Sequence, residues 1–228
     1  MRIGGFQTLT LSDFGNRPAC IVFTQGCNFR CPFCHNPSLT RPDDGVLIDP
    51  EEIISMMQHR ASLLRGAVIS GGEPCIQPDV EEFIARIKAL GLAVKLDTNG
   101  SKPRVLAHLL DAGLVDYIAM DIKAPVEKVS TLIGRIPIPA DLLESVELIL
   151  RSGIDHEFRS TLMTPALSPN DVLAMGEIVR GTKRYVLQTF VPDRTLDPGF
   201  RTAQPFSRRT MEHLQTALIS SGIPCEIR

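Results

Sequence analysis

The sequence predicts an α/β fold, an incomplete (β/α)6 barrel in which parallel strands alternate with helices. Two patterns in the 228 residues carry this prediction. Short β-branched apolar runs alternate with longer amphipathic stretches, as in parallel strands joined by crossover helices. Glycines follow several of the amphipathic stretches, where a left-handed helix cap is expected. No linker, low-complexity tract or internal repeat divides the chain, so we expect a single domain over residues 1–228.

Each of the six predicted units pairs a strand with a helix. The strands are predicted at residues 19–24, 67–70, 93–97, 117–121, 156–162 and 184–190. The helices are predicted at residues 50–65, 78–90, 103–112, 140–152, 169–180 and 205–221, several of them opening on proline. A short extra strand is expected at residues 3–11 and another at 224–227. In such barrels the loops at the carboxyl ends of the strands carry the functional groups.

Charge and hydropathy exclude two classes of partner. The formal net charge is -2, which provides no basic field for a phosphate backbone, so we expect no nucleic-acid partner. No segment approaches the roughly 18–20 apolar residues that cross a bilayer, and the first residues lack the pattern of a signal peptide. We therefore expect a cytoplasmic protein without a membrane partner.

The cysteines are distributed unevenly. Cys20, Cys75 and Cys225 are scattered, whereas three others, Cys27, Cys31 and Cys34, fall in a CxxxCxxC loop directly after the first predicted barrel strand. This distribution favours a metal centre over a disulfide scaffold, and a reducing cytoplasm would keep the thiols free. Three thiolates can hold three corners of a 4Fe-4S cubane and leave one iron open.

A zinc site is the alternative reading of this loop. His35 could be a fourth ligand, because cysteine and histidine suit tetrahedral zinc. His35 directly follows Cys34, however, so the two side chains reach one small ion awkwardly.

Polar residues follow the next strands at the same predicted rim. The second strand leads into Gly71, Gly72 and Glu73, where glycines allow a close backbone approach and a carboxylate can accept from an ammonium group. Glycine turns are common, so this motif alone is weak. The third strand leads into Asp97, Thr98 and Asn99, which could face ribose hydroxyls or form an ordinary Asn-Gly turn.

The fourth and fifth strands contribute charge. The fourth leads into Asp121 and Lys123, and a lysine ammonium is a point charge suited to a carboxylate. A solvent-exposed lysine is the alternative. Arg159 in the fifth strand could add charge near a cofactor or pair with Asp155 or Glu157.

The cysteine spacing, with aromatic Phe33 before the last cysteine, resembles the motif of the radical SAM superfamily. The resemblance implies a radical SAM barrel whose open iron chelates S-adenosylmethionine. One electron then splits the sulfonium and gives a 5'-deoxyadenosyl radical. It also implies that Phe33 lies beside the adenine and that Gly71, Gly72 and Glu73 hold the methionyl amino group.

The segments LDTNG and MDIK resemble glycyl-radical-enzyme activating enzymes. In these relatives the first motif reaches the ribose and the second the methionyl carboxylate, which assigns Asp97, Thr98 and Asn99 to the former and Asp121 and Lys123 to the latter. The relatives can also place a monovalent cation among the residues matching Asp97, Thr98 and Asp121. His35 and Asn36 could contact adenine or partner, although Asn-Pro is also a normal turn start.

Motifs in the expected order along nearly the whole chain resemble the activating proteins of anaerobic ribonucleoside-triphosphate reductase. This resemblance implies an oxidoreductase that generates a glycyl radical on that partner enzyme and receives electrons from a flavodoxin or ferredoxin-type donor. Two alternatives belong to other classes. One is a radical SAM enzyme acting on a small molecule, such as a ring contraction that forms a 7-deazapurine, and the other is a zinc or electron-transfer binding module.

Overall fold

The computed structural model describes residues 1–134 and 139–228. Their contacts divide into two compact units, each described here by itself. The first unit comprises residues 1–28, 38–98 and 102–118, and the second comprises residues 29–37, 99–101 and 119–228. The chain passes from the first to the second within the strand β5 (Tyr117–Asp121).

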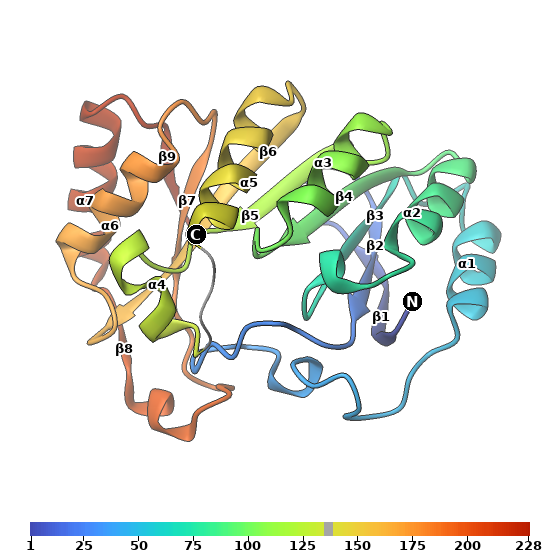
Figure 1. Cartoon of the computed structure of the whole chain (residues 1–228), viewed down its shortest axis with the longest axis horizontal. Coiled ribbons are helices and arrows are strands. Elements are labelled where there is room, and N and C mark those ends of the chain that lie inside the picture. The colour runs from blue at the N-terminus through green and yellow to red at the C-terminus, as the bar shows by residue number, and fades with distance from the viewer. Residues whose placement is uncertain (135–138) are drawn as a thin grey trace. The chain divides into compact units, whose positions relative to one another are not determined.

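The first unit is a sheet with helices packed against it (Figure 1). Its strands are β1 (Ile3–Thr10), β2 (Ala19–Thr24), β3 (Gly66–Gly71) and β4 (Ala93–Thr98). β1 runs antiparallel to β2, whereas β2, β3 and β4 are parallel neighbours. Thr24 pairs with Gly71 in register, so the carboxyl ends of β2 and β3 lie together. Its helices, with apolar faces buried, are α1 (Pro50–His59), α2 (Val80–Ala89) and α3 (Pro103–Asp111).

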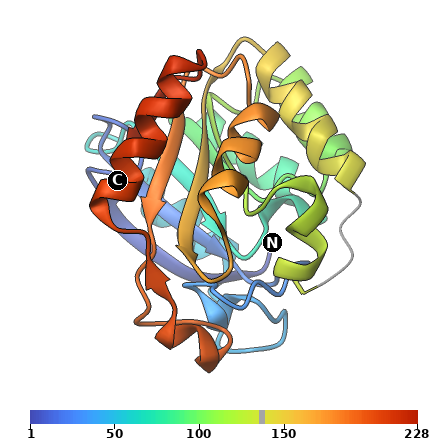
Figure 2. The same cartoon turned by 90° about the vertical axis from the view of Figure 1, so that its left-hand side faces the viewer.

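The second unit contains a second parallel sheet region. β6 (Asp155–Thr164), β7 (Tyr185–Thr189) and β9 (Cys225–Ile227) are parallel neighbours in that order, and the short β8 (Gln204–Pro205) pairs antiparallel with β6. Just past β5, the Ile122 backbone N donates to Arg159 O at 2.8 Å. The helices are α4 (Val126–Leu132), α5 (Pro139–Arg151), α6 (Pro169–Ile178) and α7 (Arg208–Ser220). α7 packs against α6 and β9 (Figure 2).

The predicted strands are confirmed to within two residues at each end. Two helix boundaries were wrong. The helix predicted over 50–65 ends at His59, and the one predicted over 205–221 begins at Arg208. The second difference has a local cause, because Pro205 belongs to β8 while the Ser207 side chain caps α7 by accepting from Thr210 N at 3.1 Å.

Candidate functional site

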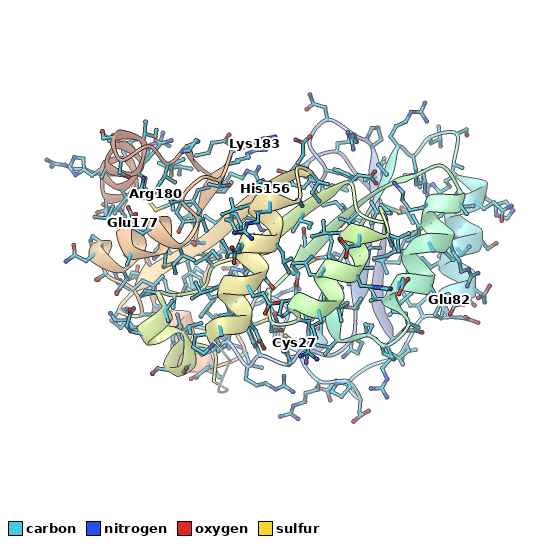
Figure 3. All side chains as sticks on the ribbon, turned by 45° about the horizontal axis from the view of Figure 1, so that its top comes forward. Cys27, Glu82, His156, Glu177, Arg180 and Lys183 are labelled. Atoms are coloured by element: carbon cyan, nitrogen blue, oxygen red, sulfur yellow. The ribbon has the colours of Figure 1, made fainter. Side chains whose placement is uncertain are left out.

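The cysteine loop, residues 25–41, leaves the end of β2 and is closed at its base. Within the first unit, Gly26 N donates to Leu39 O at 2.9 Å and Cys27 N donates to Thr40 O at 3.0 Å. The buried Gln25 side chain adds a donor bond of 2.8 Å to Ser38 O. Cys27 lies at this base (Figure 3), and the stretch carrying the other two thiols leaves from it along the chain. The stretch that carries the three cysteines is therefore a loop closed at its base.

The middle of the loop, residues 29–37, is held within the second unit. Arg30 N donates to Ile133 O at 2.8 Å, and Asp197 N donates to Pro32 O at 2.9 Å. Cys34 N donates to Cys31 O at 3.0 Å, which forms a tight turn between these two cysteines. Segments distant in sequence therefore fix the course of the loop on both sides of Cys31.

Three predicted contact residues of this loop have different surroundings. The Phe33 ring is buried, with its centroid 6.3 Å from that of Phe200. His35 is exposed at the loop surface, where it stacks on Phe190 at 5.6 Å between centroids and its Nε2 lies 3.0 Å from Val191 O. Asn36 is also exposed. His35 therefore already has two partners from the end of β7.

The buried Cys31 thiol needs a compensating group to ionise. Burial raises its pKa to about 11, while the nearby Lys123 ammonium acts in the opposite direction. Such a thiol stays protonated at neutral pH unless a metal replaces the proton. Among residues 1–134 and 139–228, no group of three or more His, Cys, Asp or Glu side chains is placed to hold a single metal ion. A cubane binds its cysteines on separate iron atoms, so it does not require the three sulfur atoms to converge on one point.

Gly71 and Gly72 bring the end of β3 against the base of the cysteine loop. Gly72 N donates to Thr24 O and Glu73 N donates to Gly26 O, both at 2.9 Å. A Cβ at Gly72 would lie 2.0 Å from Gly26 O, which leaves no room for a side chain. Gly71 adopts a φ of 109°, which favours glycine. Both glycines thus serve backbone packing next to Cys27.

Glu73 is a buried carboxylate with defined donors. Its Oε1 accepts from Thr98 Oγ1 at 2.7 Å and from Cys75 N at 3.0 Å. The Thr98 hydroxyl, predicted to face a ribose or a cation, is directed at this carboxylate. Burial, together with the neighbouring Glu73 charge, raises the Cys75 pKa well above its usual value, so this thiol stays protonated.

The other two members of the third-strand motif have local partners. Asp97 Oδ2 accepts from Ser70 Oγ at 3.0 Å, and Lys95 Nζ lies 3.3 Å from Asp97 Oδ1. Asn99 Oδ1 accepts from Ser101 N at 2.9 Å, which is the side-chain turn of the alternative reading.

Asp121, Lys123 and Arg159 come together in the second unit. Asp121 Oδ2 lies 3.1 Å from Lys123 Nζ, and Asp121 Oδ1 accepts from Arg159 Nε at 3.0 Å. Burial alone would raise the pKa of Asp121, but Lys123 and Arg159 lower it to about 2. Burial likewise disfavours charged Lys123, yet the attraction of Asp121 raises the pKa of this lysine above its usual value. Lys123 is 20% exposed, which contradicts the alternative of a solvent-exposed lysine.

Both carboxylate oxygens of Asp121 therefore already face cations. A further monovalent cation there would be repelled by the two neighbouring charges. The cation prediction for Asp97, Thr98 and Asp121 gains no support from this geometry and stays a prediction.

Three parts of this arrangement were missed by the sequence interpretation. Phe200 packs on Phe33, Arg228 pairs with Glu157, and the Ser160 hydroxyl donates to Ile122 O at 2.7 Å between Asp121 and Lys123. The sequence signal that could have indicated the position of Phe200 is Asp197-Pro198, a helix-start pattern before Phe200 in which the Asp197 side chain accepts from Gly199 N.

None of the helices in the described part of the chain is long and apolar enough to cross a membrane.

Comparison with known proteins identifies the family. The family model of the Radical SAM superfamily matches residues 21–176. A Methanocaldococcus jannaschii protein named as a glycyl-radical enzyme activating enzyme is 30% identical over 206 residues, which are 87% of this chain and 84% of that protein. A Thermococcus kodakarensis protein named as a GTP 3',8-cyclase is 30% identical over 183 residues, 79% of this chain and 59% of that protein. The pyruvate formate-lyase-activating enzyme of Staphylococcus aureus is 38% identical over 85 residues, 35% and 34% of the two chains.

Solved structures agree on the fold. The crystal structure of Streptococcus suis SuiB bound to precursor peptide SuiA matches with a TM-score of 0.68 at 14% identity and covers 91% of this chain. The match includes 48% of SuiB, so this chain spans about half the length of that structure. The predicted α/β radical SAM fold is confirmed. The chain thus belongs to the radical SAM superfamily, whose enzymes use a 4Fe-4S cluster and S-adenosylmethionine.

Proposed function

We propose that this enzyme is an activase that generates a glycyl radical on a partner enzyme, anaerobic ribonucleoside-triphosphate reductase. The observation that carries the proposal is the similarity over 87% of the chain to a protein named as a glycyl-radical enzyme activating enzyme. When bound, the cluster would supply one electron for cleavage of S-adenosylmethionine to methionine and 5'-deoxyadenosine, and the hydrogen atom gained by 5'-deoxyadenosine would come from a glycine of the partner. The electron comes from a flavodoxin or ferredoxin-type donor.

The residues proposed to hold the cluster are Cys27, Cys31 and Cys34. The donor set fits an iron–sulfur cluster, since it offers three thiols in a closed loop and residues 25–41 contain no fourth cysteine. The zinc alternative needs His35, whose ring stacks on Phe190 and whose Nε2 faces Val191 O. That engagement supports the cluster over zinc.

Two charged groups are proposed to fix the methionyl part of S-adenosylmethionine. Lys123, whose positive charge is stabilised by Asp121, would hold the carboxylate. Glu73, presented by the Gly71–Gly72 backbone and buried, would accept from the amino group. A buried carboxylate binds an ammonium more strongly than an exposed one, because water screens the pair less.

The remaining predicted contact residues differ in burial and in whether they would touch S-adenosylmethionine directly. Buried Phe33 supplies an apolar surface suited to adenine, and Asn99 is buried in its turn. Thr98 and Arg159 act through Glu73 and Asp121, to which they are hydrogen-bonded. Exposed His35 and Asn36 would face the adenine or the partner.

The test is an anaerobic reconstitution with iron and sulfide, followed by three measurements. Iron and sulfide content should correspond to one 4Fe-4S cluster per chain. Addition of dithionite and S-adenosylmethionine should give 5'-deoxyadenosine. Addition of the anaerobic reductase from the same cell should give a protein-based glycyl doublet by EPR, absent with the Cys31→Ala variant. Cleavage without a doublet on any glycyl enzyme of that cell would reject the activase.

A second candidate function is supported by one specific observation. The GTP 3',8-cyclase relative is also 30% identical over 183 residues, which favours a small-molecule substrate. This candidate predicts that added purine nucleotides are consumed in the absence of any partner protein and in step with 5'-deoxyadenosine. Mass spectrometry of the nucleotide pool with and without the reductase distinguishes the two candidates.

A further inference from the structure

Glu157 is a buried carboxylate to which the proposed reaction assigns no role. Its side chain in β6 is 2% exposed. A buried carboxylate is strongly destabilising unless cations and hydrogen-bond donors surround it. Glu157 precedes Arg159 by two residues, so both side chains lie on the same face of the strand.

One partner of Glu157 is an arginine two strands away. Arg228 Nη2 lies 3.0 Å from Glu157 Oε2, and Arg228 Nη1 lies 3.5 Å from Oε1, so guanidinium and carboxylate meet side by side. The Arg228 backbone N donates to Leu187 O, and Thr189 N donates to Arg228 O, both at 2.9 Å. β7 separates β9 from β6, a span of about 9.6 Å at ordinary strand spacing, which a long arginine side chain can bridge.

From Glu157 the charges alternate in sign towards the end of β5. Arg159 Nη1 lies 4.0 Å from Glu157 Oε1, while Arg159 Nε donates to Asp121 Oδ1 at 3.0 Å. Asp121 Oδ2 in turn faces Lys123 Nζ at 3.1 Å. On its other side Glu157 faces Arg184 Nη1 at 3.7 Å, and Arg184 pairs with Glu226 at 2.7 Å. Arg159, Arg184, Arg228 and Lys123 thus alternate with Glu157, Asp121 and Glu226 in one ion-pair network.

Asp121 interacts with two cations at once, and this sharing controls how strongly its carboxylate attracts Lys123. Arg159 occupies one oxygen of Asp121 and shares its negative charge. If Arg159 turned away, Asp121 would attract Lys123 alone, and an anionic ligand would have to compete with the full carboxylate charge. Glu157 lies nearest Nη1 of Arg159, whereas Asp121 accepts from Nε, so the two carboxylates hold different nitrogens of one guanidinium and together oppose this rotation.

We propose that Glu157 and Arg228 are positioning residues for the carboxylate-binding end of β5. Glu157, held by Arg228, keeps Arg159 against Asp121 and so leaves the Lys123 ammonium available to the methionyl carboxylate. This inference rests on the proposed binding of S-adenosylmethionine by Lys123. It assigns a role in cofactor affinity to a residue that lies outside every motif of the sequence.

The primary test is Arg228→Gln in the full reconstituted chain. The dissociation constant for S-adenosylmethionine, from isothermal titration, and the KM for 5'-deoxyadenosine formation with dithionite should both rise about three- to tenfold, the lower part of the range for coupled neighbours in one ion-pair network. The kcat and the EPR spectrum of the reduced cluster without S-adenosylmethionine should not change. Arg228→Lys, which keeps the charge, should recover part of the affinity.

A matched control is the exposed ion pair between Glu177 on α6 and Arg180 just after that helix (Figure 3). Arg180→Gln removes an arginine from an ion pair of the same chemistry, and the hydrogen bonds of Arg180 go to Glu177 and to Ser221 O rather than to Glu157, Asp121 or Lys123. It should leave the affinity for S-adenosylmethionine unchanged. Equal affinity in Arg228→Gln, Arg180→Gln and the unsubstituted enzyme would overturn the inference while leaving the proposed function intact.

Loss of folding stability is separated from loss of positioning by a double variant. Arg228→Gln leaves Glu157 buried with one partner fewer, so its melting temperature should fall, and Glu157→Gln with Arg228→Gln should recover much of that fall. The double variant should nevertheless keep the weakened affinity, because Arg159 has lost its charged neighbour. Decarboxylated S-adenosylmethionine provides the probe for the group involved, since its affinity should not respond to Arg228→Gln. Recovery of full affinity in the double variant, or an equal loss for the decarboxylated probe, would reject the positioning role.

Discussion

The Thr98 hydroxyl donates a 2.7 Å hydrogen bond to Oε1 of Glu73, so the ends of β4 and β3 meet at a buried carboxylate. The same oxygen accepts from Cys75 N at 3.0 Å. A carboxylate fixed in this way presents its remaining accepting positions in a defined direction. Thr98 is thus connected to the proposed amino-group site through Glu73.

Thr98→Val removes this donor while keeping the shape of the side chain. We expect the free energy of unfolding to fall by about 1–3 kcal/mol, because Glu73 is buried and loses a hydrogen bond. The affinity for S-adenosylmethionine should also fall, whereas Thr98→Ser should retain most of both. Urea denaturation and isothermal titration measure the two quantities. A Thr98→Val enzyme with unchanged affinity would show that Thr98 does not act through Glu73.

The cysteines should separate into two groups on substitution. Cys27→Ala, Cys31→Ala and Cys34→Ala should each lose most of the iron and all 5'-deoxyadenosine formation. Cys225→Ala should leave both nearly unchanged, since the pKa of Cys225 is raised to about 12 by burial and this thiol stays protonated. Iron and sulfide analysis after reconstitution provides the measurement. Similar losses across all four variants would contradict the ligand assignment.

Gly72→Ala should disturb the base of the cysteine loop. The new Cβ would lie 2.0 Å from Gly26 O, and a backbone atom cannot move aside as a flexible side chain can. We expect a loss of several kcal/mol in the free energy of unfolding and poor retention of iron.

Gly91→Ala is the matched control for this substitution. Gly91 has a φ of 75°, and a Cβ there would meet nothing within 4 Å, so only backbone strain of about 1 kcal/mol is expected. Iron content in Gly91→Ala should equal that of the unsubstituted protein. If Gly72→Ala retained iron as well as Gly91→Ala does, close packing at Gly72 would not be needed for the cluster.

The alternation of strands and helices was readable from the sequence because it depends on local periodicity. Buried parallel strands are short apolar runs, and the motifs at residues 71–73, 97–99 and 121–123 follow three of them at the ends of β3, β4 and β5. Helix α4 was missed, since its seven residues are too few to show a clear period. The late start of α7 depends on β8, a pairing with β6 that no local pattern encodes.

Side-chain pairings were less accessible than motif positions. The sequence assigned Thr98 to a ribose or a cation, yet its hydroxyl faces Glu73. Arg159 had Asp155 or Glu157 as its alternative partners. It lies 4.0 Å from Glu157, but its Nε donates to Asp121, a partner that the sequence did not suggest. Both pairings join residues from different strands, and their choice depends on register, twist and burial. Such choices are tertiary, so one sequence without its structure leaves them open.

The start of α6 gives a pH-dependent prediction away from the proposed site. Asp171 accepts from Ser168 N at 2.8 Å and lies 2.7 Å from Lys128 Nζ. Burial would raise the pKa of Asp171, but the bonds from Lys128 and Ser168 lower it below its usual range. Because the folded-state pKa is lowered, this stabilisation is complete above the unfolded-state pKa of about 3.9 and is lost as the pH falls through the folded-state value.

Asp171→Asn should therefore lower the free energy of unfolding by about 1 kcal/mol at pH 7, the usual effect of losing a capping interaction. The difference from the unsubstituted protein should shrink as the pH falls from about 5 to below 3, because the carboxyl of Asp171 then becomes neutral in both states. Guanidinium denaturation at a series of pH values measures this difference in the free energy of unfolding. Glu177→Gln, on the exposed surface of the same helix, should show little effect at neutral pH because water screens its pair with Arg180. A difference for Asp171→Asn that stayed constant from pH 7 to pH 3 would mean that its shape, rather than its charge, stabilises the start of α6.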